Sequence, residues 1–204
     1  HGGTIREVML LTSAITAVVL AGSSGAARRD PAKTRETRTW EWRQAATLGD
    51  TPTWFSAAFT IGDTAYVGSG HGFVTAFWRY DPGRDTWTRK ADFAGKARGA
   101  AVAFSIGNKG YVGLGYSDDV RFADLWEYDP IADRWTPKAP LPAAVRDHAQ
   151  AFVIGRKAYI VGGMTCTGND CTDLKEVWEY DSQPDRWTKR ADLPGKATAP
   201  ACFV

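Results

Sequence analysis

Residues 177–187 read VWEYDSQPDRW, and the same pattern stands at 125–135 as LWEYDPIADRW and at 77–87 as FWRYDPGRDTW. Each copy has a tryptophan in second place, Tyr-Asp in the middle and another tryptophan at the end. The closing tryptophans and one earlier tryptophan recur at intervals of 45, 48 and 52 residues, at Trp42, Trp87, Trp135 and Trp187. A recurrence at this period predicts a repeat architecture in which each unit is one supersecondary element.

The sequence between these tryptophans predicts four short strands in each unit. Twenty residues after each of the first three tryptophans comes a glycine, in IGDTAYVGSG, IGNKGYVGLG and IGRKAYIVGG, which begin at Ile61, Ile106 and Ile154. Short apolar runs separated by turn residues indicate strands rather than helices. The first strand of each unit is rich in alanine, which suits the crowded inner strands of a radial array, and we expect Ala149–Ile154 to be covered on both faces. The tryptophan of the fourth strand is expected to fill the space between neighbouring units.

These motifs resemble the kelch repeat, whose marks are a glycine pair after a Tyr-containing strand, an aromatic strand and a Trp at a fixed distance. The pair Gly162-Gly163 matches fully, whereas the first two units have Ser69-Gly70 and Leu114-Gly115 in its place. The resemblance covers residues 40–204. It implies an all-β fold, a kelch-type β-propeller with three full four-stranded blades at about 53–92, 98–139 and 146–192.

Partial strands are expected at both ends of this repeat region. Trp40–Ala46 is predicted to be an outer strand without partners of its own, and a truncated blade is predicted to begin at Thr198. Kelch propellers usually close with six or seven blades. The resemblance therefore implies an incomplete ring, and so a fragment of a longer protein, with self-association of a half-propeller as the alternative.

The first 39 residues differ in composition from the repeats. An apolar run, Val8–Leu20, follows Arg6 and precedes small residues, and it is too short for a membrane span of ~20 residues. This layout predicts a signal peptide at 1–27, a flexible leader at 28–39 and an exported protein, periplasmic or extracellular.

The overall composition excludes two classes of protein. The 204 residues include 25 Lys+Arg and 23 Asp+Glu, a formal net charge of +2, which argues against nucleic-acid binding. A hydrophobic content of 44 % fits a globular chain and not a protein with several membrane spans.

The loop from the second to the third strand varies in length between units, at 71–77, 116–125 and 164–177. Length variation on a constant scaffold indicates the functional part, and in kelch propellers this loop and the strand-four-to-strand-one loop line the ligand face. By the same resemblance, Arg98 and Arg146 point toward the central cavity, where an arginine suits carboxylate recognition. Pairing with neighbouring loop carbonyls or acids is the structural alternative for both arginines.

Further candidates lie on the same loops. Asp118 and Asp119, with Asp124 nearby, could hold a cation or a set of sugar hydroxyls, or could form a solvated acidic loop. The other candidate ligand-binding residues are His71, Tyr116 and Asp170, whereas His148 stands at the ordinary kelch position and is expected to be structural.

Two of the three cysteines, Cys166 and Cys171, flank a short turn on the longest loop. A disulfide is favoured, because an exported chain permits it and a two-cysteine metal site lacks further ligands. Cys202 then stays unpaired or pairs outside this sequence. No metal site is predicted.

Three functions remain open at this point. The preferred one is a non-catalytic exported propeller that binds a protein or glycan through the variable loops, with no cofactor. The second resembles galactose oxidase, which needs copper and a set of two His and two Tyr. The third resembles the kelch-type sialic acid mutarotase, a sugar epimerase that would use an acid and an arginine on the loop face.

Overall fold

A computed structural model describes residues 6–11, 16–21, 41–48, 54–70, 74–168 and 170–198 of the chain. Every regular element within these ranges is a β-strand, so the described part of the chain is all-β. None of the described residues forms a helix of the length and hydrophobicity needed to cross a membrane.

Three antiparallel sheets of four strands form the body of the molecule. We call them the first, second and third units. The first unit contains β4 (Ala57–Ile61), β5 (Thr64–Gly68), β6 (Phe77–Asp81) and β7 (Thr86–Lys90). The second contains β8 (Val102–Ile106), β9 (Lys109–Gly113), β12 (Leu125–Asp129) and β13 (Arg134–Lys138). The third contains β14 (Gln150–Ile154), β15 (Lys157–Val161), β18 (Val177–Asp181) and β19 (Arg186–Lys189).

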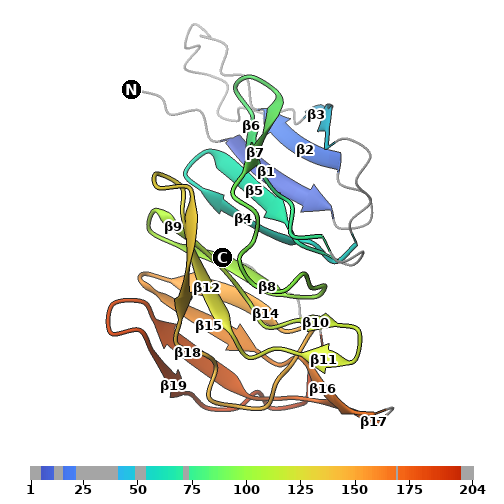
Figure 1. Ribbon diagram of the computed structural model, residues 1–204, viewed down its shortest axis with the longest axis vertical. Helices are drawn as coiled ribbons and strands as arrows, with labels where there is room; N and C mark the ends of the chain where they lie inside the picture. The colour runs from blue at the N-terminus through green and yellow to red at the C-terminus, as the bar shows by residue number, and fades with distance from the viewer. Residues whose placement is uncertain are drawn as a thin grey trace, which may run out of the picture.

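The three units lie one after another in a stack, face against face (Figure 1). The first strands of the units are neighbours, since β8 contacts β4 on one side and β14 on the other. Small side chains of these strands, such as Ala57, Ala101, Ala103 and Ala151, line a groove of about 410 Å³. Four-stranded antiparallel sheets with their first strands side by side form a propeller-like arrangement. The four strands that the sequence predicts in each unit are present.

A recurring set of hydrogen bonds, which we call the Tyr-Asp-Trp clamp, joins each unit to the chain before it. In the first unit, Tyr80 Oη donates to Asp85 Oδ1 at 2.7 Å, and the Ala46 N–H donates to the same oxygen at 2.7 Å. The indole of Trp87 donates in turn to Ala46 O at 2.8 Å. The second and third units repeat this geometry with Tyr128, Asp133 and Trp135 on Ala91, and with Tyr180, Asp185 and Trp187 on Ala139.

The clamp explains why these residue types recur. The hydrogen bond from the Ala46 N–H, with that from Tyr80, holds the pKa of Asp85 below its usual value, while burial and the Asp85 carboxylate raise the pKa of Tyr80. Trp135 and Trp187 also pack against the aromatic cores between units, as expected for the fourth strand. Each clamp therefore combines apolar packing with hydrogen bonds to the backbone N–H and C=O of one half-buried alanine.

The chain before the first unit forms a three-stranded antiparallel sheet of β1 (Arg6–Leu11), β2 (Thr16–Ala21) and β3 (Glu41–Thr47). The expectation that Trp40–Ala46 lacks partners is therefore wrong, because β3 pairs with β2 from Glu41 opposite Ala21 to Thr47 opposite Thr16. Nothing in the structure tests a signal peptide at 1–27, which stays a prediction. The leader at 28–39 and the strand expected after Thr198 lie outside the described residues.

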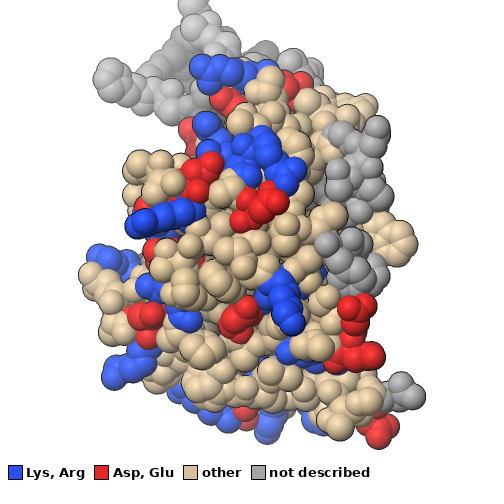
Figure 2. Space-filling view, in the orientation of Figure 1, with Lys and Arg blue, Asp and Glu red and all other residues tan. Residues whose placement is uncertain are grey.

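Two short hairpins lie inside segments that the sequence predicts as loops. They are β10 (Tyr116–Ser117) with β11 (Val120–Arg121), and β16 (Met164–Thr167) with β17 (Asp170–Asp173). Both belong to the variable connection from the second to the third strand. On the face shown in Figure 2, acidic and basic side chains are interspersed, with no extended basic surface.

The third unit departs from the expected burial. Residues of β14 are half-buried and its last residue, Ile154, is 62 % exposed, so the expectation that Ala149–Ile154 is covered on both faces is wrong for this strand. The equivalent strand of the second unit, β8, buries Val102, Phe104 and Ile106. The difference arises because β8 has a described unit on each side, whereas β14 has one on one side only.

Candidate functional site

The connections from strand four to strand one and from strand two to strand three meet at one end of the stack, which we call the loop face. Phe55, Ala100 and His148 occupy equivalent positions there, just before the first strands, and all three have left-handed backbone conformations with φ of 53°, 48° and 51°. Such conformations are uncommon for residues other than glycine and persist where surrounding contacts fix them. The contacts are hydrogen bonds between units, from Ala100 N to Phe55 O and from His148 N to Ala100 O, each at 3.2 Å.

Aromatic side chains gather where the groove lined by alanines reaches the loop face. The Phe55 and His148 rings meet edge to face with centroids 5.4 Å apart, and Tyr116 stacks on His148 at 6.1 Å. Trp54 and Phe55 are 61 % and 45 % exposed. Phe55 and Trp54 precede Ser56, which lines the groove, so the cluster lies at its mouth. We call these four residues the aromatic cluster.

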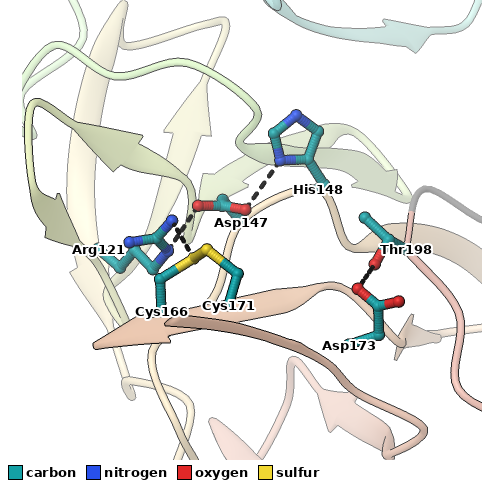
Figure 3. Close-up of a disulfide and its surroundings, with 7 residues drawn as sticks. All are labelled: Arg121, Asp147, His148, Cys166, Cys171, Asp173 and Thr198. Carbon is teal, nitrogen blue, oxygen red and sulfur yellow. Dashed lines mark hydrogen bonds and ion pairs between the residues drawn. A yellow bond between two sulfur atoms is a disulfide. The ribbon is translucent and has the colours of Figure 1, made fainter. Parts of the chain in front are cut away.

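A buried carboxylate orients the imidazole of this cluster. Asp147 is 1 % exposed, and its Oδ1 lies 2.8 Å from His148 Nδ1. Its other oxygen forms an ion pair with Arg121 Nε at 2.7 Å. The backbone of Asp147 is held too, by hydrogen bonds in both directions with Met164. Asp147 occupies the Nδ1 side of the His148 ring. The other ring nitrogen points away from Asp147 (Figure 3), and so it is the nitrogen that faces a ligand.

Arg98 and Arg146 do not reach toward a ligand. Both are buried, at 1 % and 0 % exposure. Arg98 forms an ion pair with Asp124 and donates to Leu114 O at 3.1 Å, and Arg146 pairs with Glu176 at 2.5 Å and donates to Gly162 O at 3.3 Å. Of the two roles that the sequence leaves open, this geometry favours the structural one over ligand contact, since every donor direction described is used inside the chain.

The acidic partners of these arginines also bind the tryptophan of the third strand. Trp126 Nε1 donates to Asp124 at 2.8 Å and Trp178 Nε1 donates to Glu176 at 3.3 Å. Burial raises the pKa of Glu176, but the Arg146 guanidinium outweighs it, so the pKa lies below its usual value. The arginine, acid and tryptophan therefore tie the two connections of one unit together, and we call each set an arginine brace.

The predicted acidic ligand set does not come together. Asp118 and Asp119 lie at the exposed turn of the β10–β11 hairpin, whereas Asp124 is engaged by Arg98. The described residues contain no group of three or more His, Cys, Asp or Glu side chains that could hold a metal ion. His71 lies outside the described residues.

A disulfide joins Cys166 and Cys171 across the β16–β17 hairpin. Arg121 of the second unit contacts the sulfur of Cys166 at 2.8 Å, so this hairpin reaches the neighbouring unit beside Asp147 (Figure 3). Asp170, at the start of β17, is exposed. The Thr198 hydroxyl donates to Asp173 on the same hairpin. The hairpin therefore contacts Arg121, which in turn pairs with the Asp147 that holds His148 of the aromatic cluster.

Sequence reasoning missed most of this site. It named Tyr116 as a ligand residue and His148 as a structural one, but not Trp54, Phe55, Asp147 or Arg121. One signal was present in the sequence, because Phe55 and His148 each stand two residues before the first strand of their units. Aligning the units on that strand places both at the same end of the stack.

No protein-family model and no curated protein matches the chain. Solved structures do match, among them one described as the structure of YjhT, with a TM-score of 0.61 and 21 % sequence identity. The match covers 71 % of this chain and 53 % of the other, so the chain spans about half the length of that protein. Likeness at this identity concerns the fold alone, and it agrees with the propeller-like arrangement of the three units.

Proposed function

We propose that this chain is an exported kelch-repeat β-propeller that binds a protein or glycan ligand at the loop face without catalysing a reaction. The kelch assignment is supported by the three units with recurring Gly, Tyr and Trp positions. Export is supported by the apolar run Val8–Leu20 and by the Cys166–Cys171 disulfide, a bond that persists in oxidising compartments. The binding proposed needs no cofactor and involves no nucleic acid.

The aromatic cluster at the mouth of the groove is the observation that carries the proposal. Large, exposed aromatic side chains beside a concave surface are typical of binding sites, because they lose much contact with water when a ligand covers them. A sugar ring offers an apolar C–H face that fits Phe55 or Trp54 and a hydroxyl edge that fits the outward nitrogen of His148. An apolar protein side chain flanked by a backbone carbonyl fits the same pair of surfaces.

Alanine variants of the cluster test this proposal. The variants Phe55→Ala and His148→Ala are made in the full chain. Alanine tolerates the left-handed backbone at these two positions, since Ala100 adopts the same conformation at the equivalent position. The ligands are immobilised glycans in one arm and secreted proteins in the other. We expect saturable binding that each variant weakens about tenfold or more.

The matched control is Ile131→Ala, an 86 % exposed side chain on the turn between β12 and β13, away from the loop face. It is expected to bind like the parent chain. The proposal fails if neither arm gives saturable binding, or if Ile131→Ala weakens binding as much as Phe55→Ala.

One observation favours an enzymatic alternative, a sugar epimerase. The Asp147–His148 pair, with the Arg121 ion pair behind it, can accept or release a proton at the outward nitrogen of His148. Epimerase action of this kind predicts faster interconversion of the α and β anomers of a free sugar, measured by NMR, and loss of that acceleration in His148→Ala. The copper oxidase alternative rests on no such geometry, because the described residues form no metal-binding group.

A further inference from the structure

Arg121 is linked to the aromatic cluster through Asp147. Its side chain comes from β11 of the second unit, is 14 % exposed and pairs through Nε with Asp147 Oδ2 at 2.7 Å. On its other side, Nη2 contacts the sulfur of Cys166 at 2.8 Å, so Arg121 lies between the disulfide and Asp147 (Figure 3). Among the described residues, Asp147 is the only acid that pairs with Arg121. The guanidinium is therefore fixed in place with one carboxylate to neutralise.

The Asp147 carboxylate is shared between this arginine and His148. It is 1 % exposed, and its Oδ1 lies 2.8 Å from His148 Nδ1. The other described groups that face the imidazole are the rings of Phe55 and Tyr116, so its charged neighbours are Asp147 and, behind it, Arg121. A carboxylate paired with an arginine only accepts hydrogen bonds, so Nδ1 carries the hydrogen of the bond to Asp147.

The arginine decides what the outward nitrogen of His148, Nε2, offers to a ligand. Arginine is always charged, so Arg121 and Asp147 already balance each other, and the group has no net charge when the imidazole is neutral. A proton on Nε2 would place a second cation on a single carboxylate in a position with little water. The neutral ring, with its hydrogen on Nδ1, leaves Nε2 as a bare acceptor, whereas an imidazolium would make it a charged donor.

The backbone groups described around the cluster are paired with one another. Ala100 N donates to Phe55 O and His148 N donates to Ala100 O, and Asp147 and Met164 exchange hydrogen bonds in both directions. An extended peptide is commonly recognised through main-chain groups that are free to bond it. The cluster offers exposed rings beside one acceptor nitrogen instead, which suits a sugar ring more than a peptide.

We propose that Arg121 is a positioning residue that keeps His148 neutral and thereby makes the loop face select a neutral sugar over an acidic one. This inference rests on the proposed function, the binding of a ligand at the aromatic cluster. A neutral sugar donates a hydroxyl hydrogen to Nε2 and lays its C–H face on Phe55 or Trp54. A sugar carboxylate at the same point has no hydrogen to donate, and it loses water without gaining a partner.

Removal of Arg121 should reverse this preference. In Arg121→Met, Asp147 loses its counter-charge and His148 takes up a proton in its place. The group again has no net charge, but Nε2 is now a charged donor that faces the ligand. The loss of an arginine would by itself weaken the binding of an anion, so the expected change is opposite in sign to the direct effect of the lost charge.

NMR of the full chain with isotope-labelled histidine tests the state of the ring and needs no ligand. The nitrogen chemical shift of Nε2 at neutral pH shows whether it carries a hydrogen, and loss of the signal in His148→Ala assigns it. We expect a bare Nε2 in the parent chain and in Arg121→Lys, and a protonated Nε2 in Arg121→Met. A protonated Nε2 in the parent chain overturns the proposal even if Arg121→Met does not fold. A bare Nε2 in folded Arg121→Met overturns it as well.

Calorimetry with matched sugars tests the selectivity. The probes are the methyl glycosides of glucose, galactose and mannose, each paired with the corresponding uronic acid, which has a carboxylate in place of the terminal CH₂OH. We expect the parent chain to bind at least one neutral form about tenfold more tightly than its acid form, and Arg121→Met to lose or reverse this preference. Arg156→Met removes a positive charge at the exposed turn before β15, and as the matched control it should keep the parent preference.

The possible outcomes separate this inference from the proposed function. Saturable binding that is weakened in Phe55→Ala but favours the acid form, or keeps its preference in Arg121→Met, refutes the role of Arg121 and leaves the proposed function standing. Absence of binding to all six sugars, with a bare Nε2, refutes a neutral sugar as the ligand. The proposed function then depends on binding of a protein at the same cluster.

Discussion

Each sheet ends in its fourth strand on the side opposite the neighbouring first strands, and we call this side the outer edge of the stack. The outer edge and the loop face are built on opposite plans. At the outer edge, the Tyr-Asp-Trp clamp appears in all three units with the same atoms bonded at 2.7 to 3.2 Å. At the loop face, the arginine brace appears in the second and third units only, because the first unit has Thr53 and Ala76 where the others have arginine and an acid. Its exposed Trp54 and Phe55 stand in that same connection. The invariant edge holds the units together, and the variable face is where a ligand can be accommodated.

The largest effect is expected from removing an arginine brace. Arg146→Met leaves the Glu176 carboxylate and the Gly162 carbonyl without their buried partner, and should lower the free energy of unfolding by about 3 kcal/mol. Urea denaturation measures it. Arg156→Met, at an exposed position on the turn before β15, is the control and should change stability little. Equal losses in the two variants would show that Arg146 does not brace the loop face.

Removing one clamp is expected to have the next largest effect. Asp133→Gly deletes the acceptor of the Tyr128 hydroxyl and the Ala91 N–H without penalising the left-handed backbone at this position, where φ is 47°. We expect a loss of about 2 kcal/mol in urea unfolding. Asp133→Asn keeps an oxygen acceptor and should lose less than half as much. If both variants unfold alike, hydrogen bonding to this side chain does not hold the units together.

Acid should weaken the third unit through Glu179. The Arg190 guanidinium, followed by Lys157, lowers the pKa of Glu179 to about 2 from an ordinary value of 4.5. Because the folded chain binds the proton more weakly than the unfolded one, this contribution is complete above pH 4.5 and is lost as the pH falls toward 2. The thermal midpoint should therefore fall less between pH 5 and about pH 2.5 in Glu179→Gln than in the parent chain. Parallel pH profiles for the two proteins would contradict this assignment.

The smallest global effect is expected from the disulfide. The double variant Cys166→Ser with Cys171→Ser opens a short hairpin that protrudes from the third unit, so its amides at 164–173 should exchange faster. The free energy of global unfolding should change by about 1 kcal/mol or less, because the opened hairpin gains in the folded chain much of the freedom that the bridge removes from the unfolded chain. A loss as large as that of Asp133→Gly would mean that the hairpin supports the whole stack.

The sequence predicts the repeated parts of the fold well, because a repeat shows the same requirement several times. Three copies of Tyr-Asp-x-x-x-Asp-x-Trp place the third and fourth strands and the turn between them, and the described strands lie where the pattern indicates. The pattern does not reveal that the second aspartate binds a peptide of the preceding unit, at Ala91 or Ala139, since that partner lies more than 40 residues away in the chain.

The loop face is less predictable for a physical reason. Arg98 and Arg146 are found easily as equivalent residues, but whether an arginine faces a ligand or a carboxylate of its own chain depends on how the variable connection folds back. Asp124 and Glu176 are different residue types at the ends of loops of different length, which hides their equivalence. The β10–β11 and β16–β17 hairpins are short and polar, with no apolar alternation to indicate them.

The hydrogen bonds of the clamp go to the backbone N–H and C=O of an alanine in the preceding segment, and this has a consequence for how such molecules can be assembled. A joint made chiefly through backbone N–H and C=O groups makes few demands on the side chain of the residue being held, so tandem duplication of a segment produces a joint that already fits. Copies can then diverge in the connections of the loop face without disturbing the joint at the outer edge. The molecule is in this sense modular: the clamp is the same between successive units, and the connections of the loop face differ from unit to unit.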